Sequence, residues 1–433
     1  MTLRNCEKVF LLLQGPPSRF SSLLFKELKS RQVKCFKIHL SLGDWLFWQG
    51  GSADNYRGKL SDWPAYLKDY IQKNGVTDVV YYADRTPYHK AAIKIAAELG
   101  INAITYENGY LRPFWITLEH GGMSRLSHFP NDPQDILRKG QNLPLPVTHK
   151  NLGHPFWLEA WNEVVFSLAN YFDIAFFRHY QSDKVYNPIY EYLNYIPRLL
   201  RDKKNQKKAE AITSRLKAEK QRFFLFPLQM QNDYQLRENS PFDHQSEAIE
   251  LAIQSLKLSG QQDTSLLFKI HPMDNGIEPW EKIISELTAR HNLEGRILVI
   301  DGGNLNKIMN FCTGIITINS TVGVHGLQKI KPIVTLGDAM YDIPGLTSQQ
   351  PLTAFFQQPE PPIAELVDAF VRLIAATIQI HGSFISAKGR ELAVHEMCDR
   401  LITNSVNQPG AFLPTPPRIR KTVSMSKGEQ LHI

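Results

Sequence analysis

The fold class follows from the stretch Val9-Phe10-Leu11-Leu12-Leu13-Gln14-Gly15-Pro16 near the amino terminus. Its first five residues are all apolar and do not alternate with polar ones. A strand of this kind is typical of a parallel sheet that is covered by helices on both faces. The run ends at Gln14-Gly15-Pro16, where the glycine either forms a tight turn or lets backbone N–H groups approach a ligand closely.

The same alternation of apolar strands and amphipathic helices continues outward from this stretch. It predicts strands near Lys8–Leu13, Val33–Leu40, Thr77–Tyr82 and Ile101–Tyr106, with helices near Ser18–Arg31, Ser61–Asn74 and Tyr88–Leu99. A second series has strands near Arg222–Pro227, Ser265–His271, Arg296–Ile300, Gly314–Ile318 and Pro332–Leu336, with helices near His244–Leu258, Pro279–His291, Leu305–Phe311, Thr321–Lys329, Ile363–Ile380 and Ser386–Asn404. Strands that alternate with helices predict βαβ units and parallel sheets.

The chain therefore divides into four predicted segments. Residues 1–130 form an amino-terminal Rossmann-like domain, and residues 222–405 form a second one. Residues 131–221 form a loop and helical region with a basic segment, and residues 406–433 form a tail. The predicted fold is α/β, with two Rossmann-like domains facing across a cleft and a helical, basic insertion.

The composition excludes several classes of protein. The chain has 433 residues, of which 43% are hydrophobic and 21% charged, as in an ordinary globular protein. Its four cysteines include no CxxC pair, which argues against a zinc site and favours a reducing compartment. The apolar run Val9–Leu13 is too short for a signal-peptide core, and no apolar run of about 18 residues is long enough to span a membrane. We therefore expect a cytoplasmic protein.

Polar residues follow the predicted strands at their carboxyl ends, where ligands of such sheets bind. In the first series they are Gln14, Gly15, Asp44, Asp84, Arg85 and His89. A tight strand-to-helix turn is the alternative for Gln14 and Gly15, and a solvated turn is the alternative for the other positions. The sequence has neither GxGxxG nor GxxxxGK[ST], so a dinucleotide site and a P-loop are not supported.

The fourth strand leads into Tyr106-Glu107-Asn108-Gly109-Tyr110-Leu111-Arg112-Pro113, with Glu119 a little further on. Carboxylates that act as a nucleophile or as an acid/base need such a place on a rigid element. The alternative for Glu107 is a structural ion pair with Arg112.

In the second series, Lys269-Ile270-His271-Pro272 ends one strand and Asn319-Ser320-Thr321 joins another to a helix. A histidine in this position can bind a phosphate or protonate a leaving group. Hydroxyls at a helix amino terminus either cap the helix or bind an anion. Together the two segments favour a nucleotide phosphate.

These segments resemble the KpsS/KpsC (LipB/LipA) family of bacterial capsular polysaccharide proteins, and the KpsS branch most closely. The resemblance covers roughly residues 8–350. The segments that carry it are 13–16, 43–44, 84–85 with His89, 106–113, 271–272, 320–323 and 336–347. The segment Glu107-Asn108-Gly109-Tyr110-Leu111-Arg112-Pro113 is its most specific part.

The resemblance implies a retaining β-Kdo transferase with a GT-B-like fold, CMP-Kdo as donor and no metal or cofactor. A KpsS-like enzyme would start the poly-Kdo linker of a capsular polysaccharide on a (lyso)phosphatidylglycerol acceptor. It would work at the inner membrane surface with other capsule assembly proteins, and nucleic acid is not an expected partner. The first domain would hold the acceptor and the second the CMP-sugar.

The implied roles fall on named residues. Glu119 and Glu107 would be catalytic, in an order that the sequence leaves open. The residues that would bind substrate are Arg112, Asn108, Gln14, Gly15, Asp44, Arg85 and His89. The residues that would bind the nucleotide are Lys269, His271, Pro272, Asn319, Ser320 and Thr321.

This sequence departs from the family in two places. Glu107-Asn108-Gly109 stands where the KpsC branch has Glu-Asp-Gly, and Gly323-Val324-His325-Gly326 lacks the Glu of related transferases. A linker-extending transferase, another nucleotide-sugar enzyme of GT-B type and a non-enzymatic adaptor of the export complex are the alternatives.

The net charge of +7 lies in one place, because Arg198 to Arg222 contains ten Lys/Arg and three Asp/Glu. This basic segment and the aromatic stretch Phe156–Tyr180 predict contact with an anionic membrane surface. A solvated basic helix beside a packed aromatic one is the alternative.

Overall fold

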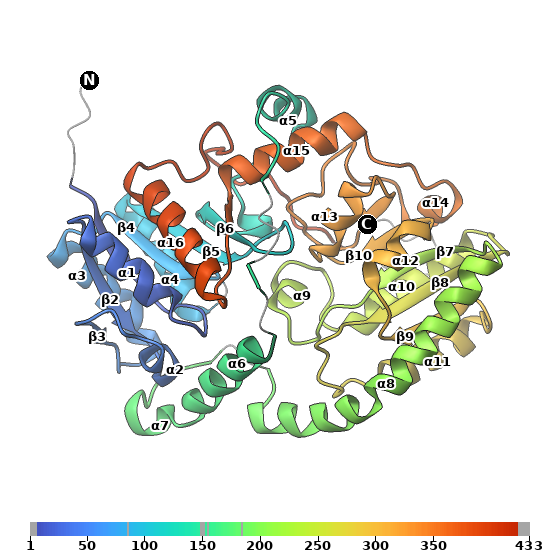
Figure 1. The fold of residues 1–433 in the computed structure, drawn as a ribbon, viewed down its shortest axis with the longest axis horizontal. Coiled ribbons are helices and arrows are strands. Elements are labelled where there is room, and N and C mark those ends of the chain that lie inside the picture. Colours follow the sequence, from blue (N-terminus) through green and yellow to red (C-terminus); the bar gives the residue numbers. More distant parts are fainter. Residues whose placement is uncertain (1–6, 85, 148–151, 154–155, 183–184, 423–433) are drawn as a thin grey trace. The chain divides into compact units, whose positions relative to one another are not determined.

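The computed structural model describes residues 7–84, 86–147, 152–153, 156–182 and 185–422. The chain forms two compact units (Figure 1). Unit 1 comprises residues 1–130, 143–184 and 372–416, and unit 2 comprises residues 131–142, 185–371 and 417–433. Each unit holds one central β-sheet.

Unit 1 contains a seven-stranded sheet in the order β12-β6-β5-β4-β1-β2-β3. Its parallel strands are β1 (Val9–Leu12), β2 (Lys34–His39), β3 (Asp54–Asn55), β4 (Asp78–Tyr82) and β5 (Asn102–Asn108). The strands β6 (Trp115–His120) and β12 (Gln379–His381) run antiparallel to their neighbours at one edge. Apart from β12, the order is that of a Rossmann-like sheet.

Two layers of helices cover this sheet. Alternate residues of β1 point to opposite faces, so that Phe10 and Leu12 enter one core and Val9 and Leu11 enter another. The helices α1 (Phe20–Ser30) and α16 (Ala387–Ile402) lie side by side over the first face (Figure 1). The helices α3 (Trp63–Asn74) and α4 (Pro87–Leu99) cover the second. The predicted two-sided burial of the first strand is confirmed.

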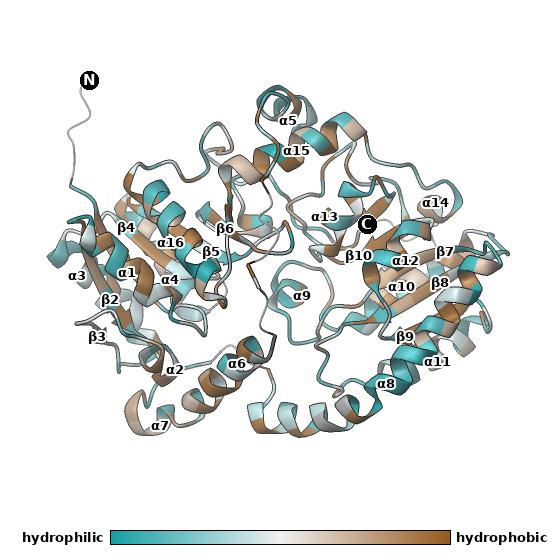
Figure 2. Ribbon diagram, in the orientation of Figure 1, coloured by the Kyte–Doolittle hydropathy of each residue, from teal (hydrophilic) through white to brown (hydrophobic). Residues whose placement is uncertain are grey.

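Unit 2 contains an all-parallel sheet of five strands in the order β11-β10-β7-β8-β9. The strands are β7 (Arg222–Pro227), β8 (Thr264–Ile270), β9 (Ile297–Asp301), β10 (Gly314–Thr317) and β11 (Ile333–Thr335). Its largest core joins one sheet face to α10 (Gln245–Leu258), α11 (Trp280–His291) and α14 (Leu352–Gln357). The central strands of both sheets are hydrophobic along their length (Figure 2).

Further helices complete the two units. Unit 1 also contains α2 (Leu42–Leu46), α6 (Phe156–Tyr171) and α7 (Asp173–Phe176). Unit 2 also contains α5 (Pro133–Gly140), α8 (Pro188–Ala218), α9 (Tyr234–Glu238), α12 (Leu305–Phe311) and α13 (Val322–Gln328). The helix α15 (Ala364–Thr377) carries the chain from unit 2 back into unit 1.

The predicted fold class, α/β with two Rossmann-like domains, is confirmed by the two sheet orders. The unit boundaries differ from the predicted segments 131–221 and 222–405. The helix α8 belongs to unit 2, whereas residues 372–416 return to unit 1, where Ile380 and Met397 join its core. Hydrophobic periodicity locates strands and helices, but it does not reveal to which sheet a carboxy-terminal helix returns.

No helix in the described part of the chain is long and apolar enough to cross a membrane.

The return of the chain into unit 1 makes a testable prediction. A protein that ends at residue 371 lacks β12 and α16, so the core residues Phe10, Leu24 and Ile116 lose their covering layer. We expect unit 1 to lose cooperative unfolding in thermal denaturation and to become sensitive to limited proteolysis. A protein that ends at residue 422 keeps every element of unit 1 and should behave as the full chain does. Equal protease resistance of the two truncated proteins would contradict the assignment of residues 372–416 to unit 1.

Candidate functional site

Each sheet has one position at which the strand order reverses. In unit 1 this position lies between β1 and β4, and in unit 2 it lies between β7 and β10. Ligands of doubly wound sheets bind beyond the carboxyl ends of the strands at such positions. In unit 1, β1 leads into Gln14 and Gly15 at this position, and in unit 2, β10 leads into Asn319. Other predicted residues lie on β5 and β6 and after β8, one or two strands away.

In unit 1 the Gln14–Gly15 loop follows β1. The Gly15 N–H donates to Oδ1 of Asp44 at 3.3 Å, and the Tyr180 hydroxyl donates to Oε1 of Gln14 at 3.3 Å. A Cβ atom on Gly15 would lie 1.9 Å from Oγ of Ser21, so a larger residue would force Ser21 to move. The backbone of this loop is fixed by its neighbours, and its glycine is required for packing.

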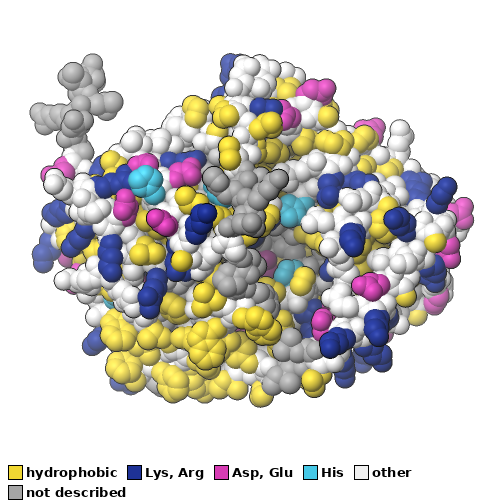
Figure 3. Space-filling model, in the orientation of Figure 1, with side chains coloured by type: hydrophobic (Ala, Val, Ile, Leu, Met, Phe, Trp, Pro, Cys, Tyr) yellow, Lys and Arg dark blue, Asp and Glu magenta, His cyan; other side chains and the backbone are white. Residues whose placement is uncertain are grey.

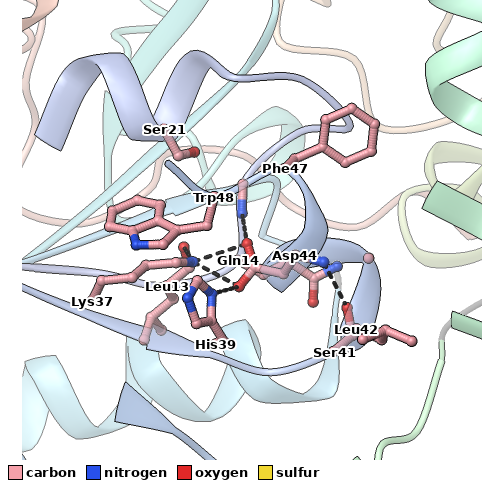
Figure 4. A network of polar contacts seen from close by, with 12 residues as sticks. Leu13, Gln14, Ser21, Lys37, His39, Ser41, Leu42, Asp44, Phe47 and Trp48 are labelled. Atoms are coloured by element: carbon pink, nitrogen blue, oxygen red, sulfur yellow. Dashed lines mark hydrogen bonds and ion pairs between the residues drawn. The ribbon is translucent and has the colours of Figure 1, made fainter. Parts of the chain in front are cut away.

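Asp44 lies at the centre of a buried polar network (Figure 4). The Lys37 ammonium donates to both carboxylate oxygens of Asp44 at 2.9 and 2.6 Å, and also to the Leu13 carbonyl at 2.8 Å. The His39 ring nitrogen Nδ1 lies 3.3 Å from the same carboxylate. The side chain of Asp44 is therefore occupied by the protein itself, which argues against the predicted direct contact with substrate.

Burial and charge act in opposite directions on Asp44. Burial on its own raises the pKa of this carboxyl, but the Lys37 charge and the His39 hydrogen bond outweigh it and lower the pKa to about 2. Burial lowers the pKa of Lys37, and the Asp44 charge opposes that shift. Asp44 and Lys37 therefore form a buried ion pair in which each charge stabilises the charged form of the other.

The helix α2 links this network to α6 and α7. The Leu42 N–H donates to Oδ1 of Asp173 at 2.6 Å, and the Gly43 N–H donates to Oδ1 of Asn170 at 2.8 Å. These side chains satisfy N–H groups that a helix leaves open at its first turn. Burial raises the pKa of Asp173 to about 7, against the opposing effect of the Leu42 hydrogen bond.

The predicted substrate residue His89 and the strand-end residue Asp84 are both tied to the backbone. The His89 side chain is fully buried, with Nδ1 at 2.8 Å from the Ala83 carbonyl. Asp84 is buried as well, and its Oδ2 accepts a hydrogen bond from the Met123 N–H at 2.8 Å. Both positions support the turn that follows β4. Arg85 lies outside the described residues.

The two predicted catalytic glutamates lie on neighbouring antiparallel strands. Glu107 of β5 is opposite Thr117, and Glu119 of β6 is opposite Thr105. Both side chains therefore point to the same face of the sheet, as diagonal neighbours about 7–8 Å apart. Glu119 is fully buried and accepts a short hydrogen bond from the Ser127 hydroxyl, whereas Glu107 is half-buried at the end of its strand.

The loop between these strands holds the other two predicted residues of the segment. Asn108 is half-buried and Arg112 is exposed. The Gly109 N–H donates to the Trp115 carbonyl at 2.7 Å, and a Cβ atom on Gly109 would lie 2.6 Å from that backbone. The glycine allows the loop to turn tightly. Arg112 lies in this loop between β5 and β6, and Glu107 lies at the end of β5.

In unit 2, Asn319 follows β10 and belongs to a buried network of amides. Its Oδ1 accepts from Nε2 of Gln229 at 3.0 Å, and its Nδ2 donates to the carbonyls of Gln235 and Asn239, each at 2.8 Å. Gln245 in turn binds the backbone of Gln229 at 2.7 and 3.0 Å. The side chain of Asn319 joins β10 to β7 and α9, which argues against its predicted contact with the nucleotide.

His271 begins the loop after β8. Its Nδ1 accepts a hydrogen bond from the Met273 N–H at 3.1 Å, so a neutral ring carries its proton on Nε2. Pro272 is exposed, and Lys269 is buried one residue before the end of β8. Burial lowers the pKa of Lys269, and the nearby Asp301 charge opposes this shift.

Arg198 of α8 holds this loop in place. Its guanidinium donates to the His271 carbonyl at 2.7 Å, to the Asp274 carbonyl, and to Oδ1 of Asp301 at 2.6 Å. Its side chain is 14% exposed. Arg198 was predicted to face a membrane as the first residue of the basic segment, but the structure places it beneath the His271 loop.

Ser320 and Thr321 precede α13 and are half-buried. The Tyr341 hydroxyl donates to the Ser320 carbonyl at 2.5 Å. A Cβ atom on Gly323 would lie 2.2 Å from that hydroxyl, so the glycine of this segment makes room for Tyr341. The Ser320 hydroxyl accepts from the Val322 N–H at 3.3 Å, in the turn that leads into α13.

Sequence reasoning missed several residues that shape the two positions. They are Lys37, His39, Ser127, Gln229, Gln245 and Tyr341. Gln229 directly follows β7, so the rule that pointed to Asn319 could have found it. Lys37 lies inside an apolar strand, and its charge required a buried partner.

The architecture and the site together define an α/β protein with two Rossmann-like units of the kind that make up GT-B folds. Residues 77–385 match the family described as capsule polysaccharide biosynthesis protein, and the chain belongs to that family.

Among its relatives, the capsule polysaccharide export protein KpsS of Escherichia coli is 29% identical over 398 residues, covering 89% of this chain and 98% of the relative. The capsule polysaccharide modification protein LipB of Neisseria meningitidis serogroup A is 31% identical over 408 residues, covering 89% of this chain and 93% of the relative.

Solved structures resemble the chain more distantly. The β-Kdo 2,7 transferase KpsC of Thermosulfurimonas dismutans has a TM-score of 0.43 and 14% identity, with 92% of this chain and 99% of that chain covered. The UDP-GlcNAc 2-epimerase of Neisseria meningitidis has a TM-score of 0.29 and 12% identity, with 92% and 100% covered.

The buried ion pair makes a prediction about stability. Asp44→Asn leaves the Lys37 charge buried without a counter-charge, so we expect the free energy of unfolding to fall by about 3–5 kcal/mol in urea at neutral pH. A double variant, Lys37→Met with Asp44→Leu, removes both charges and should regain much of this loss. Wild-type stability of Asp44→Asn would contradict the ion-pair account.

The same pair predicts a pH dependence. Since the folded-state pKa of Asp44 is about 2 and its ordinary value is about 3.9, its contribution is complete above about pH 4 and disappears as the pH falls towards 2. The wild type should therefore lose more stability over this range than the double variant.

Proposed function

We propose that this protein is a retaining β-Kdo transferase that moves Kdo from CMP-Kdo to a (lyso)phosphatidylglycerol acceptor and so begins the poly-Kdo linker of a bacterial capsular polysaccharide. The observation that carries the proposal is the pairing of capsule-family membership with two Rossmann-like sheets whose polar loops lie at the ligand-binding edges. The relatives named for capsule export and modification agree with this role. We also propose that it acts on the cytoplasmic face of the inner membrane, with other capsule assembly proteins.

The donor belongs to unit 2 in this proposal. Lys269 lies near the end of β8, His271 and Pro272 follow that strand, and Ser320 and Thr321 follow β10; the two strands lie on either side of β7. The His271 Nε2–H can donate to a phosphate oxygen, as can a hydroxyl of Ser320 or Thr321. The ammonium of Lys269 adds positive charge at the same edge. Stabilising the charge that develops on the departing CMP is the chemistry that this edge supplies.

The acceptor and the sugar carboxylate belong to unit 1. Retention by double displacement needs a carboxylate nucleophile, and Glu107 is the half-buried member of the glutamate pair. Glu107 would attack the anomeric carbon as CMP leaves with the bonding electron pair on its phosphate. The acceptor hydroxyl would then attack the same carbon and break its bond to Glu107, and the hydroxyl proton would pass to water. Glu119, buried against Ser127, would act on the site as a positioning residue. The exposed Arg112 suits the Kdo carboxylate, because a guanidinium binds carboxylates bidentately.

Gln14, Gly15, Asn108 and Arg85 remain proposed as residues that line the acceptor site, whereas Asp44 and His89 are proposed to hold its walls. A linker-extending transferase would differ from this proposal only in its acceptor. An adaptor without activity would need neither the half-buried glutamate nor the donor loops.

Binding of CMP to unit 2 can be measured without any acceptor. A ligand at 100 times its Kd stabilises the folded state by about 2.7 kcal/mol, so saturating CMP should raise the melting temperature measurably. Arg198→Met frees the His271 loop and should reduce this rise, whereas Arg201→Met changes an exposed arginine on the same helix and should leave it unchanged. No stabilisation of the wild type by CMP would count against the donor site.

The two glutamates are predicted to differ in their effects. Glu107→Gln should lower kcat by a factor of about 1000 or more, because it removes the nucleophile, while the melting temperature stays near that of the wild type. Glu119→Gln should lower activity less and stability more, since it alters a buried hydrogen bond to Ser127. A fully active Glu107→Gln protein would exclude Glu107 as the nucleophile.

A further inference from the structure

Unit 1 carries a set of exposed apolar side chains on α2, α6 and α7 and on the residue between α6 and α7, which we call the aromatic face. Its members are Trp45, Leu46, Trp157, Leu158, Trp161, Leu168, Tyr171, Phe172 and Phe176. Trp157 is 76% exposed and Trp161 is 65% exposed. Figure 3 shows hydrophobic side chains gathered over α6 and α7. Exposed apolar patches of this kind mark interaction sites in folded proteins.

The aromatic face is the outer side of helices that are firmly attached to the unit. On the inner side of α6, Phe166 is buried and its ring lies 6.2 Å from the ring of Phe47. Asn170 and Asp173 bind the first N–H groups of α2, as described above. The exposed side chains are thus held in place by buried contacts on the opposite side of the same helices.

Positive charge lies next to the aromatic face. A pocket of about 420 Å³ follows α7, and it is lined by Lys59, Leu60, Ser61, Arg178, His179, Tyr180 and Gln181. Two of these residues are cationic, and none of the described residues that line the pocket is acidic. Arg178 lies two residues beyond Phe176, which is 54% exposed. An apolar surface is thus bordered by a site that favours an anion.

We propose that the aromatic face of α2, α6 and α7 inserts into the interfacial layer of an anionic phospholipid bilayer, with a lipid phosphate held in the pocket of Lys59, Arg178 and His179. This inference rests on the proposed function, because it names the surface from which the lipid acceptor is reached.

The composition and geometry of the face favour a bilayer over a protein partner. Tryptophan and tyrosine concentrate at membrane interfaces, where an apolar ring and a polar edge are both accommodated. The apolar residues stand out on helix surfaces, and the cations sit in a recess beside them, which matches acyl chains lying beneath anionic head groups. Each cation near an anionic surface adds to the attraction.

The face is also connected to the predicted acceptor loop within the same unit. Tyr180 lines the pocket, stacks on Tyr88 with ring centroids 5.6 Å apart, and donates to Gln14. The helix α2 carries Trp45 on the face and Asp44 in the network that binds Gly15. A lipid head group in the pocket would therefore lie beside the loop at which the strand order of unit 1 reverses.

The test is flotation with vesicles of phosphatidylcholine that contain phosphatidylglycerol, in the absence of any sugar donor. A double variant, Trp157→Ser with Trp161→Ser, should bind these vesicles at least about tenfold more weakly than the wild type, because it removes apolar area that enters the interface. The matched control, Leu258→Ser with Ile330→Ser, removes two exposed apolar side chains from unit 2 and should bind as the wild type does. Unchanged binding by the tryptophan variant overturns the proposal.

The pocket is tested separately. Lys59→Ser with Arg178→Ser should remove the preference for vesicles that contain phosphatidylglycerol over vesicles of phosphatidylcholine alone. An unchanged preference would overturn the phosphate site. If the wild type is a dimer in solution and Trp157→Ser with Trp161→Ser is a monomer that still floats with vesicles, the face binds a second copy and the bilayer proposal fails.

Docking and transfer can fail independently. If the tryptophan variant loses vesicle binding but transfers Kdo to a short-chain, monomeric lipid as the wild type does, both proposals are supported. If the wild type binds vesicles through this face but transfers Kdo to neither acceptor, the proposed function fails and the docking surface stands.

Discussion

Much of unit 1 depends on one buried carboxylate. Asp44 neutralises Lys37 inside the protein and binds the N–H of Gly15. Neither charge would be tolerated alone, since removing one partner of a buried pair leaves an uncompensated charge. Asp44 lies in the first turn of α2. The same short helix therefore contacts the Gly15 loop through Asp44, and it contacts Asn170 and Asp173 through its backbone N–H groups. The loop at the position where the strand order reverses is thus held by hydrogen bonds within the protein itself.

In unit 2, the position where the strand order reverses is held by a network of neutral side chains. At its own reversal, the amides of Gln229, Asn319 and Gln245 satisfy one another and the adjacent backbone. Amides do not titrate, so this network keeps its hydrogen bonds across the pH range in which Asp44 loses its charge. A charged residue of unit 2, Arg198, holds the His271 loop. Its guanidinium donates to the His271 and Asp274 carbonyls and forms an ion pair with Asp301. The basic segment of α8 therefore begins with a residue that has a structural role, Arg198, and continues with exposed lysines such as Lys203 and Lys207.

The sequence was informative wherever a signal was local. The strand β7 was predicted at its observed bounds, Arg222–Pro227, because a continuous apolar run has clear ends. The strands β6 and β12 were not predicted, since β6 follows a tight loop within the Glu107 segment and β12 is three residues long and pairs far along the chain. The position of polar residues at strand ends indicated the loops that shape the site, but it did not indicate what each side chain in these loops binds. Asp44, His89 and Asn319 bind other parts of the protein, and a sequence does not show whether a polar side chain turns inward.

For the exposed residues, the sequence shows the individual segments but not the surface that they form together. A helical aromatic stretch was visible in the sequence, but the participation of Trp45 and Leu46 depends on how α2 packs against α6. Likewise, Lys59 and Arg178 meet only because the chain brings residues far apart in sequence to one pocket. Contacts of this kind depend on tertiary packing, which hydrophobic periodicity does not encode.

We propose above all that the chain adds Kdo to a phosphatidylglycerol-type lipid. The most direct test is to incubate the purified protein with freshly generated CMP-Kdo and a fluorescent phosphatidylglycerol analogue, and to measure the lipid by mass spectrometry. The account predicts a new species heavier by one Kdo residue. Consumption of CMP-Kdo only with a lipid that already carries Kdo would contradict initiation and favour the extending enzyme, and an unchanged mass of both lipids would contradict transferase activity.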